Sequence, residues 1–219
     1  MIYNILDGIK AVIFDMDGSL VDSMWIWKQI DIDHFAMYDI AMPPDLQTQI
    51  EGMSFFQTAQ YIKENFPFPE TIEEMMKLWN DMAHEKYAKE VTYKKGVIDF
   101  LNICVERNIK LAIATSNSRY LFDAANDNLR LDRYFSCVIT GTEIINGKPA
   151  PDVYLEAAKK LNVDPKDCLV FEDVIKGIEA GHNAGMKVCA VDDESSFKQK
   201  EDKIKEADFF IHDFTELEF

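Results

Sequence analysis

The sequence predicts an α/β protein: a doubly wound parallel sheet that carries an all-helical insert. In the C-terminal two thirds, short apolar runs alternate with helical patterns. The runs themselves lack in-out alternation, which is typical of strands buried on both faces. Between the first apolar run and the others lies a long segment whose apolar residues recur at helical spacing. The 219 residues are enough for one substantial core and a small second module.

Five apolar runs are the expected strands of the sheet. The first, residues 11–14, stands far upstream of the rest. The other four are residues 111–114, 138–140, 169–171 and 188–191. The helical segments between these runs suit crossover connections, so we expect the strands to be parallel.

Residues 21–90 interrupt this rhythm and contain no convincing strand. Two sets of residues there recur at spacings of three and four: Trp27, Ile30, His34, Met37 and Ala41, and Ile72, Met75, Trp79 and Met82. Prolines at 43, 44, 67 and 69 separate the helices, since proline cannot continue a helix interior. We expect a core domain of residues 1–20 and 91–219 and a helical insert of residues 21–90. Its many Trp and Met side chains form a bundle core or in part line a substrate pocket.

The composition excludes several classes of partner. With 39 acidic and 23 basic side chains the formal charge is −16, and clusters of Lys and Arg for phosphate backbones are missing. We therefore expect no nucleic acid and no membrane as partner. The four cysteines form no CxxC pair, so we expect buried free thiols. No signal sequence or membrane span is recognisable, which favours a cytoplasmic protein. The charged tract of residues 198–206 is typical of the solvated face of a helix.

Polar side chains follow several of the expected strands, at the edge where a parallel sheet binds ligands. They are Asp15 and Asp17 after the first run, Thr115, Ser116 and Asn117 after the second, Lys148 beyond the third, and Glu172 and Asp173 after the fourth. Four crowded carboxylates repel one another unless cations intervene, and one lysine is too little. Since carboxylate oxygens are hard ligands, we expect Mg²⁺ at this edge, shared with a substrate phosphate.

Two of the aspartates carry the chemistry in this interpretation. Asp15 can attack phosphorus in line and form an aspartyl-phosphate, which divides one difficult displacement into two easier ones. Asp17 can protonate the leaving oxygen and afterwards deprotonate the incoming water. Gly18 permits the turn that folds the chain back over the site.

Taken alone, each of these residues also has a structural interpretation. The Asp-x-Asp-Gly stretch occurs in turns and calcium loops, although the residues after Gly18 lack the further oxygen ligands of a calcium loop. Glu172 and Asp173 suit the N-terminus of the following helix. Asp22 and Ser23 are expected to cap the first helix of the insert, with a hinge or substrate role left open.

The motifs DMDGSL, ATSN, GKPAPD and FEDVIKGIEAGHNAGM occur in the order typical of the haloacid dehalogenase superfamily. The whole chain resembles the branch of phosphoglycolate phosphatases and beta-phosphoglucomutases. This resemblance implies a Rossmann-like core with a mobile helical cap, residues 21–90. It also implies the following roles: nucleophile for Asp15, acid and base for Asp17, phosphate binding for Thr115, Ser116 and Asn117, charge balance for Lys148, and Mg²⁺ binding for Asp173, helped by Glu172, with Asp15 and the backbone carbonyl of Asp17.

Departures from the family pattern bear on the reaction. An aspartate at position 17 argues against a dehalogenase and against phosphonate hydrolases. Beta-phosphoglucomutases place a histidine and an arginine in the cap, whereas this sequence has Trp27 and Phe55, the latter in the loop that contains Gly52. A mutase must hold a second phosphate, for which arginine is well suited. Trp27, Gly52 and Phe55 are therefore the candidates for cap specificity, and they favour a less charged or more apolar leaving group.

We expect a monomeric, Mg²⁺-dependent phosphatase that hydrolyses a small phosphorylated metabolite through an aspartyl-phosphate. The main alternative is a beta-phosphoglucomutase-like phosphosugar mutase, which would make glucose 6-phosphate with almost no release of phosphate. A non-catalytic phospho-acceptor such as a receiver domain combines similar residues, but it is shorter and lacks the helical insert.

Overall fold

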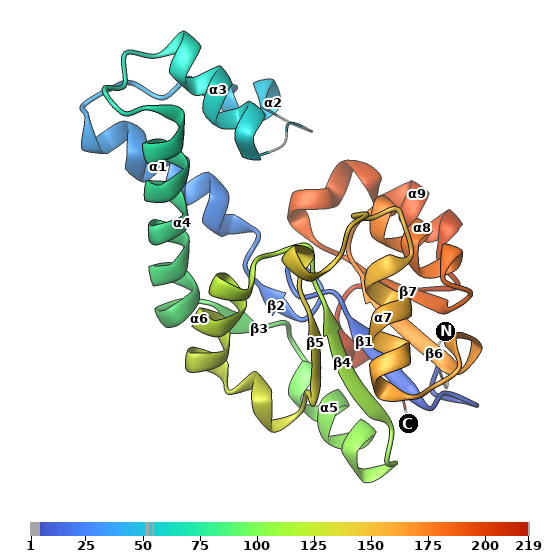
Figure 1. The fold of residues 1–219 in the computed structure, drawn as a ribbon. Helices are drawn as coiled ribbons and strands as arrows, with labels where there is room; N and C mark the ends of the chain where they lie inside the picture. The colour runs from blue at the N-terminus through green and yellow to red at the C-terminus, as the bar shows by residue number, and fades with distance from the viewer. Residues whose placement is uncertain (1–4, 51–52, 54, 219) are drawn as a thin grey trace.

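The computed structural model describes residues 5–50, 53 and 55–218. These residues form a six-stranded parallel sheet with the strand order β5-β4-β1-β6-β7-β8 (Figure 1). Its strands are β1 (Ala11–Phe14), β4 (Lys110–Ala114), β5 (Cys137–Ile139), β6 (Cys168–Glu172), β7 (Lys187–Val191) and β8 (Phe209–Ile211). The strand β1 thus lies in the middle, although it is first in the chain.

The predicted α/β class with a doubly wound parallel sheet is confirmed. All five expected strands are present, and each observed end lies within one residue of its predicted position. The sixth strand, β8, was not predicted, because its three residues form too short an apolar run shortly after a charged helix.

Successive strand residues face opposite layers of the protein. Val12 and Phe14 belong to one apolar cluster together with residues of α5 (Val97–Glu106) and α6 (Arg119–Leu129). Ala11 and Ile13 belong to a second cluster together with residues of α7 (Asp152–Leu161) and α8 (Ile175–Asn183). Burial on both faces explains why the strands are continuously apolar. The four cysteines are buried and free, as predicted.

Short 3₁₀ helices connect the elements of this core. They are η1 (Leu131–Arg133), η2 (Gly141–Glu143), η3 (Pro165–Asp167), η4 (Glu194–Gln199) and η5 (Phe214–Glu216). The last α-helix, α9 (Lys200–Glu206), contacts α8 and β8. Its Lys203 is completely buried and donates to the Val191 carbonyl at 3.0 Å and to the Ser196 hydroxyl at 2.9 Å. The prediction of a solvated face is therefore wrong for this lysine.

Helices α1 (Trp25–Met37), α2 (Leu46–Gln49), α3 (Phe55–Asn65) and α4 (Ile72–Lys89) stand to one side of the sheet, and we call them the cap helices (Figure 1). A capping box of Thr71 and Glu74 defines the start of α4. This long helix packs on α1 and α3 and also on α6 of the core. It is therefore the main connection between the cap helices and the sheet layers.

Two predictions for this segment are wrong in detail. The helix α1 ends at Met37 and does not reach Ala41, because Asp39 has a left-handed backbone with φ of 55°. The strand β2 (Val21–Asp22) pairs antiparallel with β3 (Thr92–Tyr93), although no strand was expected there. A ladder of two residues is too short to produce a periodic pattern. This ribbon lies where the chain enters and leaves the segment of cap helices.

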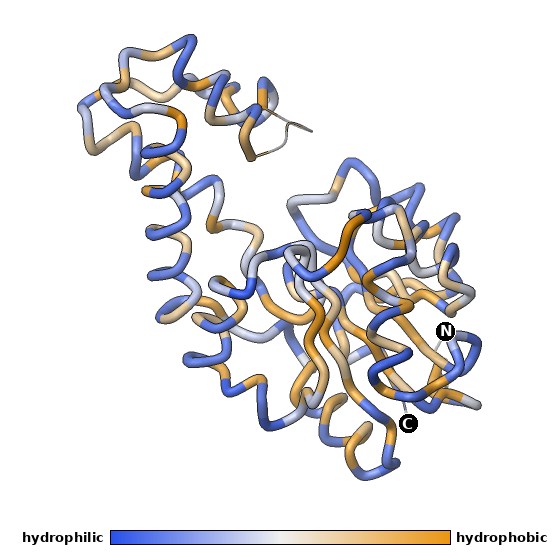
Figure 2. Tube along the Cα trace, in the orientation of Figure 1, coloured by the Kyte–Doolittle hydropathy of each residue, from blue (hydrophilic) through white to orange (hydrophobic). Residues whose placement is uncertain are grey.

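Figure 2 shows that the apolar residues concentrate along the strands and that hydrophilic residues follow the outer faces of the helices. Among the residues described, no helix has the length and apolar character needed to cross a membrane.

Candidate active site

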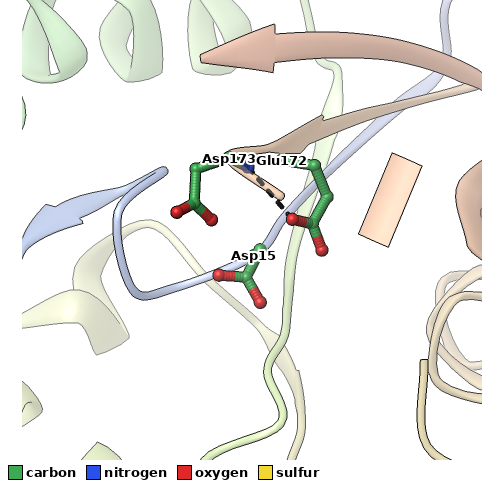
Figure 3. A group of neighbouring side chains, drawn as sticks. All are labelled: Asp15, Glu172 and Asp173. Carbon is green, nitrogen blue, oxygen red and sulfur yellow. Dashed lines mark hydrogen bonds between the residues drawn. The ribbon is translucent and has the colours of Figure 1, made fainter. Parts of the chain in front are cut away.

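Three carboxylates converge at the carboxyl ends of two neighbouring strands (Figure 3). Asp15 directly follows β1, Glu172 is the last residue of β6, and Asp173 comes next. Phe14 is in register with Phe171, so the residues that follow them meet at the same edge of the sheet. One oxygen of each carboxylate lies within 4.8 Å of the others, and all three side chains are buried.

Lys148 brings a positive charge to this cluster. Its Nζ lies 2.5 Å from Asp15 Oδ1 and 2.6 Å from Glu172 Oε1, and it also donates to the Ala114 carbonyl at 3.3 Å. Burial lowers the pKa of the Lys148 ammonium, but the charges of Asp15 and Glu172 outweigh burial and hold the pKa well above its ordinary value. The ammonium therefore stays charged.

Glu172 and Asp173 differ in their hydrogen-bond partners. Glu172 Oε1 accepts from Lys148 and from the hydroxyl of Tyr154, the latter at 2.7 Å. Glu172 Oε2 accepts from the backbone N–H groups of Asp173 and Val174 at 3.0 and 3.4 Å. Asp173 Oδ2, in contrast, is buried and has no hydrogen-bond partner in the described part of the chain. Asp173 is thus the acid with an unused oxygen.

A divalent cation fits this set of donors. Burial raises the pKa of Asp15 and of Asp173, and the charge of Glu172 raises both further, while Lys148 opposes the shift only in part. A hard cation would remove the repulsion and bind the unused oxygen, because carboxylates are its preferred ligands. The chain approaches closely here: a Cβ on Gly18, which has φ of 80°, would lie 2.3 Å from Asp173 Oδ2.

Asp17 lies beside this cluster, but other residues hold its carboxylate. Ser23 donates to Oδ1 at 2.6 Å, and the Tyr87 hydroxyl donates to the same oxygen. The Asn117 amide donates to Oδ2 at 3.1 Å. Tyr87 belongs to α4, so a cap helix directly contacts the residue expected to act as acid and base.

The expectation that Asp22 and Ser23 cap the first cap helix is wrong. The helix α1 begins at Trp25, its N-cap is Met24, and no side chain caps it. Asp22 is exposed on β2. Ser23 instead donates to Asp17, since the β2–β3 ribbon brings it back to the strand end.

Tyr87 could not be found from the sequence pattern. It is buried on α4 together with Met75, Trp79 and Ala83, at the spacing of an ordinary core residue. Its partner Asp17 is 70 positions away in the chain. No local feature therefore indicates that its hydroxyl reaches the strand end.

The loop after β4 contains the three residues expected to bind phosphate. The buried Thr115 hydroxyl accepts the backbone N–H of Asn117 at 3.0 Å, which holds the loop in a tight turn. Ser116 is exposed, and Asn117 Oδ1 accepts the backbone N–H of Ser118 at 2.9 Å. Of these three residues, Asn117 lies beside Asp17.

A cavity of about 440 Å³ lies between the cap helices and this loop. Its lining includes Trp27, Asp31, Gln47, Phe55, Ser116 and Asn117. Of the candidates for cap specificity, Trp27 and Phe55 line the cavity, whereas Gly52 lies outside the described residues. Asp31 and Gln47 were not singled out in the sequence, where a lone acid on a helix has the pattern of a surface residue.

Fold and site together define an α/β enzyme whose acidic centre lies at the carboxyl edge of a parallel sheet, beside inserted helices. Residues 12–191 match the haloacid dehalogenase-like hydrolase family, and the chain belongs to this family. The family resemblance inferred from the four motifs is confirmed.

Named proteins similar to this chain include phosphatases. A phosphorylated carbohydrates phosphatase of Thermotoga maritima is 30% identical over 82% of this chain and 83% of its own length. A probable pseudouridine-5'-phosphatase of Drosophila melanogaster is 27% identical over 91% of this chain and 89% of its own length. The solved structure of CbbY from Rhodobacter sphaeroides in complex with phosphate has a TM-score of 0.77 at 20% identity, covering 94% of this chain and 95% of that chain. At this identity, the similarity to CbbY shows a shared fold alone.

Proposed function

We propose that this chain is a phosphatase that hydrolyses phosphomonoesters of small metabolites through an aspartyl-phosphate. The family match and the relatives named as phosphatases support hydrolysis of a phosphoric monoester. The observation that carries the mechanism is the contact of Asp15 with Lys148 inside the buried carboxylate cluster. A nucleophilic carboxylate beside a fixed cation can receive a dianionic phosphate that the rest of this acidic protein would repel.

In the first step, a carboxylate oxygen of Asp15 attacks phosphorus. The new oxygen–phosphorus bond forms while the bond to the leaving oxygen breaks, and Asp17 gives its proton to that oxygen. In the second step, Asp17 takes a proton from water, and the water oxygen attacks phosphorus. The bond between phosphorus and the Asp15 oxygen breaks, so that inorganic phosphate leaves and the Asp15 carboxylate is restored.

The loop after β4 and Lys148 bind the phosphate oxygens in this proposal. The hydroxyl of Thr115 and the backbone N–H of Ser116 are hydrogen-bond donors at one side, and the Lys148 ammonium supplies charge. The Asn117 amide donates to Asp17 and to the Tyr87 hydroxyl, each at 3.1 Å, so it would have to give up one of these partners to bind phosphate.

Thr115 donates its backbone N–H to the Ile139 carbonyl of β5 at 3.0 Å, and Lys148 donates to the Ala114 carbonyl of β4. Since the sheet holds these residues, they can orient the phosphoryl group without large rearrangement.

Mg²⁺ would be held by Asp15, Asp173 and the backbone carbonyl of Asp17. Glu172 helps indirectly, since both of its oxygens are engaged in orienting Lys148 and the start of the loop before α8. When bound, the ion neutralises negative charge on the oxygens of the group that is transferred.

A phosphosugar mutase is not favoured. Such an enzyme must hold a second phosphate under its cap, which calls for Lys or Arg side chains. None of the described residues that line the cavity is Lys or Arg, and Trp27 and Phe55 lie there instead. A released alcohol is therefore expected to leave and not to be phosphorylated again.

Release of inorganic phosphate from a panel of small phosphomonoesters in the presence of Mg²⁺ tests the proposal. We expect Asp15→Asn to lose about a thousandfold or more of the wild-type turnover. Asp22→Asn is a matched control, because this aspartate is exposed and outside the cluster. Near-normal turnover by Asp15→Asn would refute the assigned nucleophile. Formation of glucose 6-phosphate from beta-glucose 1-phosphate without phosphate release would refute the hydrolase.

A further inference from the structure

The cavity below the cap helices has an aromatic wall. Trp27, Phe55 and Trp79 follow one another edge to face, with ring centroids 5.6 Å apart in the first pair and 5.7 Å apart in the second. Trp79 donates its Nε1 hydrogen to His34 at 3.1 Å, so that only its carbon surface is available to a ligand. Asp31 lies one turn beyond Trp27 on α1, on the same face, and lines the same space.

Three oxygens on the cap side of this cavity are left as free hydrogen-bond acceptors. The amide nitrogen of Gln47 donates to Asp31 Oδ2 at 2.6 Å, and that of Asn80 donates to the Met76 carbonyl at 3.0 Å. No described residue donates to Asp31 Oδ1, Gln47 Oε1 or Asn80 Oδ1. A ligand that satisfies these oxygens must bring donors.

Asp31 also faces the cavity without a counter-cation. Asp31 is 7% exposed, and no other described residue of the cavity lining carries a charge. Burial raises the pKa of Asp31 to about 6, and the hydrogen bond from Gln47 opposes this shift only in part. At neutral pH the group is therefore a carboxylate held at an energetic cost. A positively charged ligand would remove this cost. The net charge of −16 also attracts positively charged ligands to the protein.

We propose that this cavity binds the leaving group of the substrate through a protonated amine, so that the substrate is an amino-alcohol phosphomonoester. The ammonium donates to Asp31 and lies against the rings of Trp27 and Phe55, whose π faces attract cations. The inference rests on the proposed phosphatase function. The cavity reaches Asn117, whose amide contacts the proposed acid Asp17, so one substrate can extend from the strand ends into the cap.

Other leaving groups match these observations less well. A carboxylate or a second phosphate would meet the like charge of Asp31 with no Lys or Arg in the described lining to offset it. A sugar hydroxyl can donate to the free oxygens, but it carries no charge to compensate that of Asp31. The ammonium is a donor without acceptors and carries the missing charge.

Matched pairs of substrates test the amine site by kcat/KM. The pairs are 2-aminoethyl phosphate with propyl phosphate, and 3-aminopropyl phosphate with butyl phosphate, in which a methyl group replaces the ammonium. We expect wild-type protein to prefer each amine by about tenfold or more. Asp31→Asn should bring this ratio close to one. Asp33→Asn is the matched control, because this acid lies on the same helix but pairs with Lys86 at 3.0 Å, and it should keep the preference.

The result that overturns the proposal is an equal kcat/KM for amine and isostere, or a preference that survives Asp31→Asn. A higher kcat/KM for glycerol phosphate or a sugar phosphate than for either amine would overturn it as well. Acetyl phosphate, a reactive substrate with a small leaving group, separates this failure from failure of the proposed function. Wild-type protein that hydrolyses acetyl phosphate without preferring amines remains a phosphatase and lacks the amine site. Protein that releases phosphate from none of these substrates refutes both.

Discussion

At the scale of single residues, two buried charges have opposite surroundings. The Lys148 side chain is 7% exposed and lies between two carboxylates, so its charge is compensated. Asp31 is buried without a cation, so its charge is not. Removing one partner of a buried ion pair is costly, whereas removing an uncompensated charge stabilises a protein. Substitution of the two residues should therefore have opposite effects on stability.

Lys148→Met should lower the free energy of unfolding by about 3 kcal/mol, since the buried oxygens of Asp15 and Glu172 would lose the ammonium that donates to both of them. Urea denaturation measures this difference. Lys10→Met is the control, because Lys10 makes a similar ion pair with Asp167 on the exposed surface and should leave stability nearly unchanged. A Lys148 variant as stable as the wild-type protein would show that the cluster does not depend on this charge.

Asp31 makes stability depend on pH. Burial raises its pKa from 3.8 to about 6, so the folded protein holds this proton more tightly than the unfolded chain does. Below about pH 4 the group is neutral in both states and costs nothing. The penalty grows between about pH 4 and 6 and is complete above that range. At about 1.4 kcal/mol per pKa unit, the raised value corresponds to about 3 kcal/mol.

Asp31→Asn should therefore raise the free energy of unfolding at pH 7.5 by up to about 3 kcal/mol, with little effect near pH 4. Urea denaturation of wild-type and variant protein at both pH values checks this. The same difference at both pH values would contradict the assignment. Gained stability together with a lost amine preference would be a trade of stability for function.

At the scale of elements, α8 and α4 connect the strand ends to the rest of the protein. The helix α4 brings the Tyr87 hydroxyl to Asp17, and α8 packs over Glu172. A Cβ on Gly177 of α8 would lie 1.8 Å from Glu172 Oε1. This glycine therefore provides the space for the glutamate that orients Lys148.

The Gly177→Ala variant tests whether helix propensity or the contact with Glu172 has the larger effect at this position. Helix propensity alone predicts a gain of about 1 kcal/mol, because glycine weakens a helix interior. We expect a loss of stability and about a tenfold loss of kcat/KM, since the methyl group displaces Glu172 and with it Lys148. Urea denaturation and phosphate release measure the two effects. Gly147→Ala is the control, because nothing lies within 4 Å of a Cβ there. A more stable and fully active Gly177→Ala protein would contradict the contact.

At the scale of the whole molecule, the cluster of Asp15, Glu172 and Asp173 lies at the carboxyl edge of the sheet in a protein that is acidic overall. The formal charge of −16 makes this edge unfavourable for a phosphate unless cations are present. Asp15, Glu172 and Asp173 come from two strand ends, and their repulsion is a property of the assembled core. Binding of a divalent cation should therefore stabilise the entire fold.

Mg²⁺ at about 100 times its Kd should raise the free energy of unfolding by about 2.7 kcal/mol, and a chelator should reverse this and stop phosphate release. Thermal unfolding with and without the ion measures the shift in Tm. Asp173→Asn should abolish the shift and raise the stability of the ion-free protein, because the amide cannot carry the charge that Glu172 and Asp15 repel. Asp22→Asn should keep the shift. An unchanged Mg²⁺ effect in Asp173→Asn protein would remove this residue from the binding set.

Five strands and the residues that follow them could be predicted from the sequence. Strands buried on both faces are continuously apolar, and parallel strands share one carboxyl edge whatever the details of packing. Asp15, Lys148, Glu172 and Asp173 therefore meet as their positions after the runs indicate. The roles assigned to them stay predictions.

The amino-acid sequence by itself determined the α/β class, the family and the segments that contribute to the strand-end cluster, because these depend on local patterns of apolar and polar residues. Only the tertiary structure decided that Tyr87 and Ser23 hold Asp17, that Lys203 is buried, and that Asp31 faces an aromatic cavity beside Gln47. The physical reason is that each of these features depends on how separate segments pack, and a single segment carries no record of the neighbour that it will contact.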